Sequence, residues 1–193
     1  RKYWETKSGW VIETNKKDID DFIKRFPFQP TKSQIDAINS ITSDFRRGYP
    51  MSRLLEGDVG SGKTAIAATT IYAITKSRPH NSLGEKITGN LQTAYMVPTE
   101  ILAKQHYENF CSYFSHLPIK IGLITGSECK IFPSKTDATK STKISKTQLI
   151  KWISEGVVPI VIGTHALISK SVTFKHLAYA VIDEQHRFGT MQR

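Results

Sequence analysis

Cysteine and long hydrophobic runs are scarce in this 193-residue chain. Its two cysteines, Cys111 and Cys129, are too few for a disulfide scaffold or a zinc site of the CxxC type. No apolar run approaches the ~18 residues that span a bilayer, and the opening RKYWETKSGW does not resemble a signal peptide, so we expect no membrane partner. Hydrophobic residues still make up 39% of the chain, which is enough to build a core.

Charge is the next informative property. The chain carries 27 Lys+Arg against 17 Asp+Glu, a formal net charge of +10, which makes nucleic acid the first partner to consider. Half of this excess lies in residues 130–151, which contain six lysines and one aspartate. Residues 130–144 within this segment are rich in Ser, Thr and Lys, and predict either a solvated insertion or a basic flap that contacts phosphates.

The hydrophobic pattern predicts an α/β fold with a mostly parallel central sheet covered on both faces. Residues 1–25 are expected to form a linker with a helix, and Thr31 is a plausible N-cap for a helix over 32–45. A strand–turn–helix rhythm then repeats along the chain. Strands are predicted over 52–56, 92–97, 119–124, 158–163 and 177–183, and helices over 64–76, 99–114 and 145–156.

The segment GDVGSGKT fits the phosphate-binding pattern G-x-x-x-x-G-K-[ST]. Glycines let backbone N–H groups crowd around phosphate oxygens, and the following helix points its positive dipole end at them. We expect Lys63 to reach the β- and γ-phosphates and act in catalysis, and Thr64 to bind Mg²⁺. The predicted nucleotide site comprises Gly57, Asp58, Gly60, Ser61, Gly62, Lys63 and Thr64.

Two adjacent carboxylates follow the last apolar strand. Asp183 is placed to hold Mg²⁺ through water, and Glu184 to polarise an attacking water as a catalytic residue. The adjacent glutamate favours a nucleoside-triphosphate hydrolase over a small-molecule kinase.

These two motifs resemble those of the RecG branch of superfamily-two helicases, through GDVGSGKT and the string DEQHRFG that begins at Asp183. The resemblance implies a three-layer RecA-like P-loop NTPase domain that uses ATP and Mg²⁺. FQPT with Gln34 is similar to the adenine-recognition motif, so Phe28 and Gln34 are expected to bind the base.

The segments PTEILA, LITGS and GTHAL are similar to the motifs that hold the DNA backbone in that branch. The resemblance therefore implies nucleic-acid contacts at Thr99, Gly126, Thr164 and His165. It also implies that ATP and DNA binding are coupled through Gln185, His186 and Arg187.

The resemblance also implies a larger protein. Residues 26–193 correspond to a first RecA-like domain, and the second motor domain and the wedge domain that engages branched DNA are not among these residues. We therefore expect a fragment of an ATP-dependent helicase of DNA repair and recombination, located in the bacterial cytoplasm near the nucleoid. On its own it should bind nucleotide weakly, turn over slowly and not unwind DNA.

Three alternatives stay open. A transcription-repair coupling translocase shares much of the motif set but usually has an acidic residue where this chain has Gln185. A nucleotide-dependent nucleic-acid binding module would bind without hydrolysis. A small-molecule P-loop kinase predicts an arginine-rich lid, and residues 130–144 contain no arginine.

Overall fold

The computed structural model describes residues 9–80 and 84–184. Contacts gather them into two compact units that divide between Ser77 and Arg78. We call residues 9–77 the helical unit and the described residues of 78–184 the sheet unit, and each is treated by itself. The division into residues 1–25 and 26–193 stays a prediction. No helix in the described part of the chain has the length and apolar content needed to cross a membrane.

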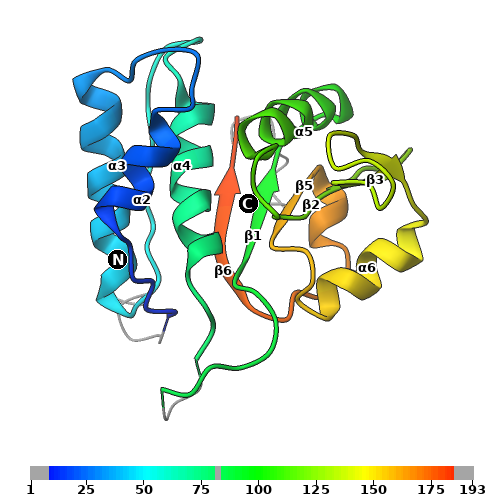
Figure 1. The fold of residues 1–193 in the computed structure, drawn as a ribbon. Helices are drawn as coiled ribbons and strands as arrows, with labels where there is room; N and C mark the ends of the chain where they lie inside the picture. The colour runs from blue at the N-terminus through cyan, green and yellow to red at the C-terminus, as the bar shows by residue number, and fades with distance from the viewer. Residues whose placement is uncertain (1–8, 81–83, 185–193) are drawn as a thin grey trace. The chain divides into compact units, whose positions relative to one another are not determined.

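The helical unit is built from α2, α3, the short 3-10 helix η1 and α4, and both α2 and α3 pack against α4 (Figure 1). The rings of Phe22 and Tyr72 stack between α2 and α4, with their centroids 4.4 Å apart. This contact packs the helix α2 on a later part of the chain. The helices span Lys16–Ile23 (α2), Lys32–Asp44 (α3), Phe45–Arg47 (η1) and Lys63–Lys76 (α4).

The start of α3 confirms Thr31 as the N-cap. The Thr31 side chain accepts a hydrogen bond from the Gln34 backbone N–H at 3.3 Å. The Gln34 side chain accepts one in return from the Thr31 backbone N–H at 2.9 Å. This reciprocal capping box satisfies two backbone donors that the first turn of a helix leaves unpaired.

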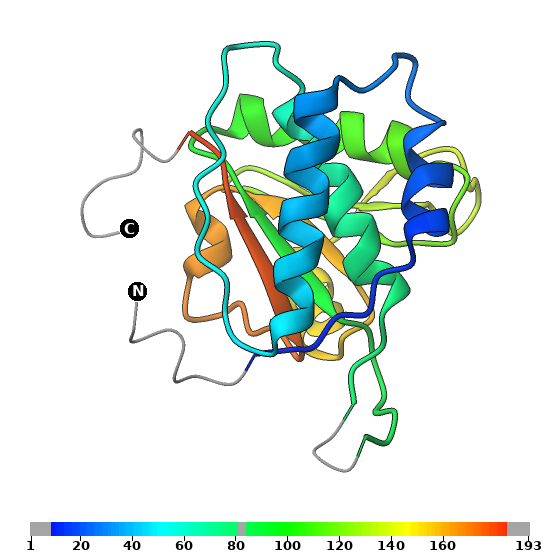
Figure 2. The same ribbon diagram turned by 90° about the vertical axis from the view of Figure 1, so that its left-hand side faces the viewer.

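The strand predicted over residues 52–56 is wrong. The segment has no regular secondary structure, and Leu54 is 76% exposed. Figure 2 draws it as a cyan coil that leads from the end of α3 to the start of α4. A strand needs a neighbour to complete its hydrogen-bond ladder, and no strand forms among residues 9–77.

The sheet unit contains one six-stranded sheet in the order β4-β3-β2-β5-β1-β6. The four strands β2, β5, β1 and β6 run parallel, and β3 and β4 add antiparallel pairs at one edge. This arrangement confirms the mostly parallel sheet. The strands span Gln92–Met96 (β1), Ile121–Ile124 (β2), Cys129–Phe132 (β3), Thr142–Lys143 (β4), Ile160–Gly163 (β5) and Leu177–Ile182 (β6).

Helices cover both faces of this sheet, as Figure 1 shows for α5 and α6. Tyr95 of β1 contacts Phe110 of α5, with ring centroids 5.3 Å apart. Its neighbour Met96, which points to the opposite face, belongs to a buried cluster with Leu149 and Ile153 of α6. The unit therefore has the predicted layers of helix, sheet and helix. Its helices span Glu100–Phe114 (α5), Lys146–Ser154 (α6) and His165–Ile168 (the 3-10 helix η2).

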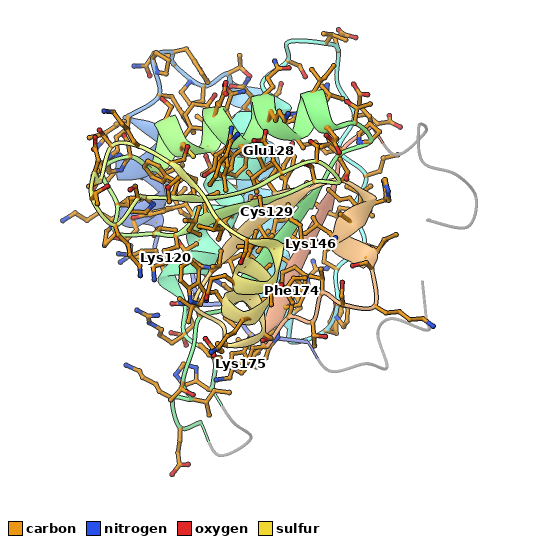
Figure 3. All side chains as sticks on the ribbon, turned by 90° about the vertical axis from the view of Figure 1, so that its right-hand side faces the viewer. Lys120, Glu128, Cys129, Lys146, Phe174 and Lys175 are labelled. Atoms are coloured by element: carbon orange, nitrogen blue, oxygen red, sulfur yellow. The ribbon has the colours of Figure 1, made fainter. Side chains whose placement is uncertain are left out.

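The prediction of a solvated insertion over residues 130–144 is wrong for its first part. Strand β3 pairs with β2, and Ile131 and Phe132 are 4% and 2% exposed. The sequence pattern does not indicate this strand, because only two apolar residues stand between a lysine and a proline. The remainder is polar and includes the exposed strand β4. The basic flap stays a prediction. Figure 3 views the sheet unit from the side of β3, with Lys120 and Lys146 labelled.

The capping box predicts a measurable stability difference on α3. Replacing Thr31 with Ala removes the acceptor for the Gln34 N–H, and we expect a loss of about 1 kcal/mol in the free energy of unfolding. Ser33→Ala is the matched control, since Ser33 is exposed in the same turn and should change stability by less than ~0.5 kcal/mol. Denaturant unfolding followed by circular dichroism measures both, and equal losses would contradict the capping role.

Candidate functional site

The glycine-rich loop in the helical unit leads directly into α4. Gly60 and Gly62 both have φ of +81°, a left-handed conformation that favours glycine. Gly62 is also the N-cap of α4. Residues 57–60 of the loop are exposed. The loop therefore sits where the positive end of a helix dipole meets solvent, which is the arrangement that binds phosphate.

Lys63 folds its ammonium group back over this loop. Its Nζ atom donates to the backbone oxygens of Gly57 at 2.7 Å and Asp58 at 2.8 Å, and lies 3.4 Å from the Ser61 hydroxyl. The ammonium group is thus held within the curve of the loop. A cation and a helix N-terminus at one loop suit an anion, so these residues fit the phosphates of a nucleotide.

Gln34 joins the cap of α3 to the phosphate loop. Its Nε2 atom donates to the Ser61 backbone oxygen at 2.8 Å, while its Oε1 atom accepts from Thr31. A glutamine three residues after an N-cap threonine signals the capping contact, whereas nothing in the sequence indicates the bond to Ser61. The amide group has a second N–H, so the adenine contact stays a prediction.

A pocket in the same unit contains both residues predicted to bind adenine. Phe26 and Phe28 both line it and stack on each other, with centroids 5.3 Å apart and an interplanar angle of 2°. Apolar and aromatic walls with one amide group suit a flat heterocyclic base. The lining residues are Phe26, Phe28, Pro30, Gln34, Ile38, Ala65, Ile66 and Thr69.

The two predicted carboxylates belong to the sheet unit and lie where β6 ends. The Asp183 backbone N–H donates to the Met96 oxygen at 2.9 Å and extends the ladder to β1. The Asp183 carboxylate accepts from the Tyr95 hydroxyl at Oδ2, at 3.1 Å, and from the Glu184 N–H at Oδ1, at 3.0 Å. Glu184 itself has a φ of +50°, which is unusual for a residue with a side chain.

His106 of α5 also faces Asp183, and sequence reasoning missed it. Its Nε2 atom lies 3.3 Å from Asp183 Oδ2. Burial lowers the pKa of His106, although the nearby Asp183 and Glu184 charges act in the opposite direction. The buried Nδ1 atom has no hydrogen-bond partner, so we assign the proton of the neutral ring to Nε2. Tyr95 is 2% exposed, and its hydroxyl reaches this carboxylate too.

The residues predicted to contact nucleic acid follow neighbouring parallel strands. Thr99 follows β1, Gly126 follows β2, and Thr164 and His165 follow β5. Because the strands are parallel, these loops share one edge of the sheet with Asp183.

Glu100, the first residue of α5, links two of these loops. Its Oε1 atom accepts a hydrogen bond from the Ser127 N–H at 3.1 Å. Hydrogen bonds from Ser127 also lower the pKa of Glu100. The loops after β1 and β2 are therefore tied together.

The exposure of these residues differs. Thr99, Gly126 and His165 are not buried, whereas Thr164 is 2% exposed and its hydroxyl is buried without a hydrogen-bond partner. The Thr99 hydroxyl accepts from the Leu102 N–H at 3.3 Å and caps α5. The roles of these residues stay predictions. The predicted coupling residues Gln185, His186 and Arg187 lie outside the described residues.

Gly62 offers a direct test of the bridge to Gln34. A Cβ atom at Gly62 would clash with Gln34 Nε2, whereas a Cβ at Gly60, with the same φ, would meet nothing within 4 Å. We expect Gly60→Ala to cost about 1–2 kcal/mol of stability from backbone strain alone. Gly62→Ala should cost more, because it also displaces the Gln34 amide. Denaturant unfolding measures both variants, and a Gly62→Ala loss no larger than that of Gly60→Ala would contradict the bridge.

Comparisons with known proteins support the helicase resemblance that the sequence motifs indicate. The DEAD/DEAH box helicase family model matches residues 31–193. The ATP-dependent DNA helicase RecG of Aquifex aeolicus is 41% identical over 182 residues, and that of Thermotoga maritima is 39% identical over 193 residues. The transcription-repair-coupling factor of Haemophilus influenzae is 35% identical over 189 residues.

A solved structure of RecG bound to a three-way DNA junction matches 98% of this chain and 22% of its own chain, with a TM-score of 0.76 and 36% identity. This likeness confirms the predicted RecA-like α/β fold. The matches cover 94% and 100% of this chain but only 20% and 22% of the Aquifex and Thermotoga proteins. The match to the coupling factor covers 98% of this chain and 14% of the factor. The chain thus spans about a fifth of the length of its RecG relatives.

Proposed function

This chain belongs to the DEAD/DEAH box helicase family, and we propose that it is the first motor domain of an ATP-dependent helicase that acts on branched DNA. The observation that carries this proposal is the Lys63 ammonium held within a glycine loop, in the same unit as a small, mostly apolar pocket lined by Phe28 and Gln34. ATP is proposed as the nucleotide, since RecG relatives are named ATP-dependent helicases.

The helical unit supplies the proposed nucleotide contacts. Phe28 and Gln34 bind the base, and the loop backbone from Gly57 to Gly62 binds the phosphates. On nucleotide binding, Lys63 exchanges its contacts with the loop oxygens for phosphate oxygens, which are charged and therefore stronger acceptors.

Mg²⁺ is proposed as the metal, with Thr64 and Asp183 as its ligands. Hydroxyl and carboxylate oxygens are the donors that Mg²⁺ prefers. When bound, the ion would neutralise charge that develops on the phosphates. The Asp183 carboxylate, oriented by Tyr95, suits this role. Glu184 is proposed to orient the attacking water and to take up its proton.

The proposed partners are DNA and the remainder of a longer protein. We propose that the loops at Thr99, Gly126 and His165 contact the DNA backbone, with Thr164 supporting them. Branched DNA is supported by the solved RecG complex with a three-way junction. A second motor domain and a wedge domain are proposed because the RecG relatives are about five times as long as this chain. A role in bacterial DNA repair and recombination, in the cytoplasm near the nucleoid, is proposed by analogy with the same relatives.

A transcription-repair coupling translocase is the second candidate, because the coupling factor of Haemophilus influenzae is 35% identical. The two candidates share ATP hydrolysis and differ in their partners. Specific binding to the transcription machinery would favour the coupling translocase, whereas selective binding of junctions over duplexes would favour the RecG-like helicase.

ATP binding and hydrolysis are separable by two substitutions. Lys63→Ala removes a charged phosphate contact, so we expect ATP affinity to fall about tenfold or more in calorimetric titrations. Glu184→Gln should keep ATP binding and lower hydrolysis by about a hundredfold or more in single-turnover assays.

Lys76→Ala, at the other end of α4, is the control for lost charge and should match the unaltered chain. Unchanged ATP affinity in Lys63→Ala would overturn the phosphate assignment. Full hydrolysis by Glu184→Gln would overturn the catalytic one, and a chain that binds ATP without hydrolysing it would be a passive binding module.

The chain on its own should be a poor ATPase. An arginine supplied by another domain is worth about 10³–10⁵ in the rate of related phosphoryl transfers. We therefore expect weak nucleotide binding, slow turnover and no unwinding of forked DNA by these 193 residues. Robust DNA-stimulated hydrolysis in a steady-state phosphate-release assay would contradict this expectation.

A further inference from the structure

We propose that Tyr95 and His106 are positioning residues that hold the Asp183 carboxylate and connect it to the loop predicted to grip DNA. The proposal rests on the proposed function, in which Asp183 is a Mg²⁺ ligand. Its basis is geometric: two side chains from β1 and α5 meet at one carboxylate oxygen, although 88 and 77 positions of the chain separate them from Asp183.

The contacts orient the carboxylate asymmetrically. The Tyr95 hydroxyl donates to Oδ2 at 3.1 Å, and His106 Nε2 lies 3.3 Å from the same atom. The other oxygen, Oδ1, accepts the Glu184 N–H at 3.0 Å. Rotation of the carboxylate would break these contacts together. The two contacts from β1 and α5 therefore meet at Oδ2 and hold the carboxylate in one orientation.

Both positioning residues stand on rigid elements. Tyr95 lies on a central strand and is 2% exposed, and His106 lies in the second turn of α5 and is 9% exposed. Their rings also contact each other, with centroids 5.2 Å apart. Groups that are held this firmly can fix the orientation of a ligand, which is how residues behind a metal ligand raise metal affinity.

The same two residues flank the loop predicted to hold the DNA backbone. Tyr95 precedes Pro98 by three residues, and His106 follows Thr99 by seven. Thr99 is the N-cap of α5, so a shift of this loop on a phosphate would move the helix that carries His106. Glu100 extends the connection to Ser127, which follows β2. The segment from Tyr95 to His106 thus provides a short physical path from DNA to the metal ligand.

Mg²⁺-dependent nucleotide binding tests the positioning role. We would titrate the chain with a fluorescent ADP analogue with and without Mg²⁺. The Mg²⁺ ratio is the dissociation constant without Mg²⁺ divided by the dissociation constant with Mg²⁺. Tyr95→Phe and His106→Leu should each lower this ratio, by up to about tenfold, while the Mg²⁺-free affinity stays unchanged. His106→Gln should restore most of the ratio, because its amide N–H reaches the place of the imidazole Nε2–H.

Tyr107→Phe is the matched control. It removes a buried hydroxyl from the residue next to His106, and it should leave the ratio unchanged. Thermal unfolding identifies any variant that has lost its fold, and Tyr95→Phe, which keeps the packed ring, then carries the test. If Tyr95→Phe and His106→Leu both match Tyr107→Phe, the positioning role is overturned.

The connection to DNA is tested by repeating the titrations with a saturating DNA duplex. In the unaltered chain we expect DNA to change the Mg²⁺ ratio at least about twofold. In His106→Leu this change should vanish, because the substitution removes the contact between α5 and Asp183. A DNA effect that survives in His106→Leu, or no DNA effect in the unaltered chain, overturns the connection. No Mg²⁺ enhancement in the unaltered chain would instead overturn the proposed function.

Discussion

The parallel alignment of β2, β5, β1 and β6 is the constraint on which the sheet unit depends. Parallel strands end at the same edge, so residues from four distant parts of the chain meet there. The same alignment requires buried apolar strands, and β2 and β5 are buried along their whole length. The parallel alignment therefore determines both packing and function. The helical crossovers that cover the sheet bring each following strand to end at the edge that carries Asp183.

Buried and partly buried polar side chains supply the specificity that the apolar core lacks. Gln34 connects a helix cap to the phosphate loop, and Tyr95 and His106 meet at Asp183. Each such group costs free energy when it loses water, unless it finds a partner. Their partners lie at the predicted site residues, so the polar contacts hold those residues in one orientation. In each unit, the part predicted to bind nucleotide or metal is supported by a residue outside the phosphate and metal motifs.

Much of the fold could be predicted from periodicity and end signals. The N-cap at Thr31, the helix that begins at Lys63 and the strand over Gln92–Met96 all stand where the pattern indicates. The strand expected over residues 52–56 does not form, because apolar residues alone do not provide a pairing partner. The short strand β3 was missed for the opposite reason, since its pairing with β2 stabilises a segment whose own pattern is weak.

The sequence by itself determined the chemistry of this protein: a phosphate loop, two adjacent carboxylates and the motifs of a helicase family. Each motif is local, because the spacing of its residues reflects the geometry of a single loop. Only the tertiary structure decided which side chains support them. Tyr95 and His106 carry no motif of their own, and their role depends on β1 lying beside β6 with α5 packed above, a contact between residues that are far apart along the chain.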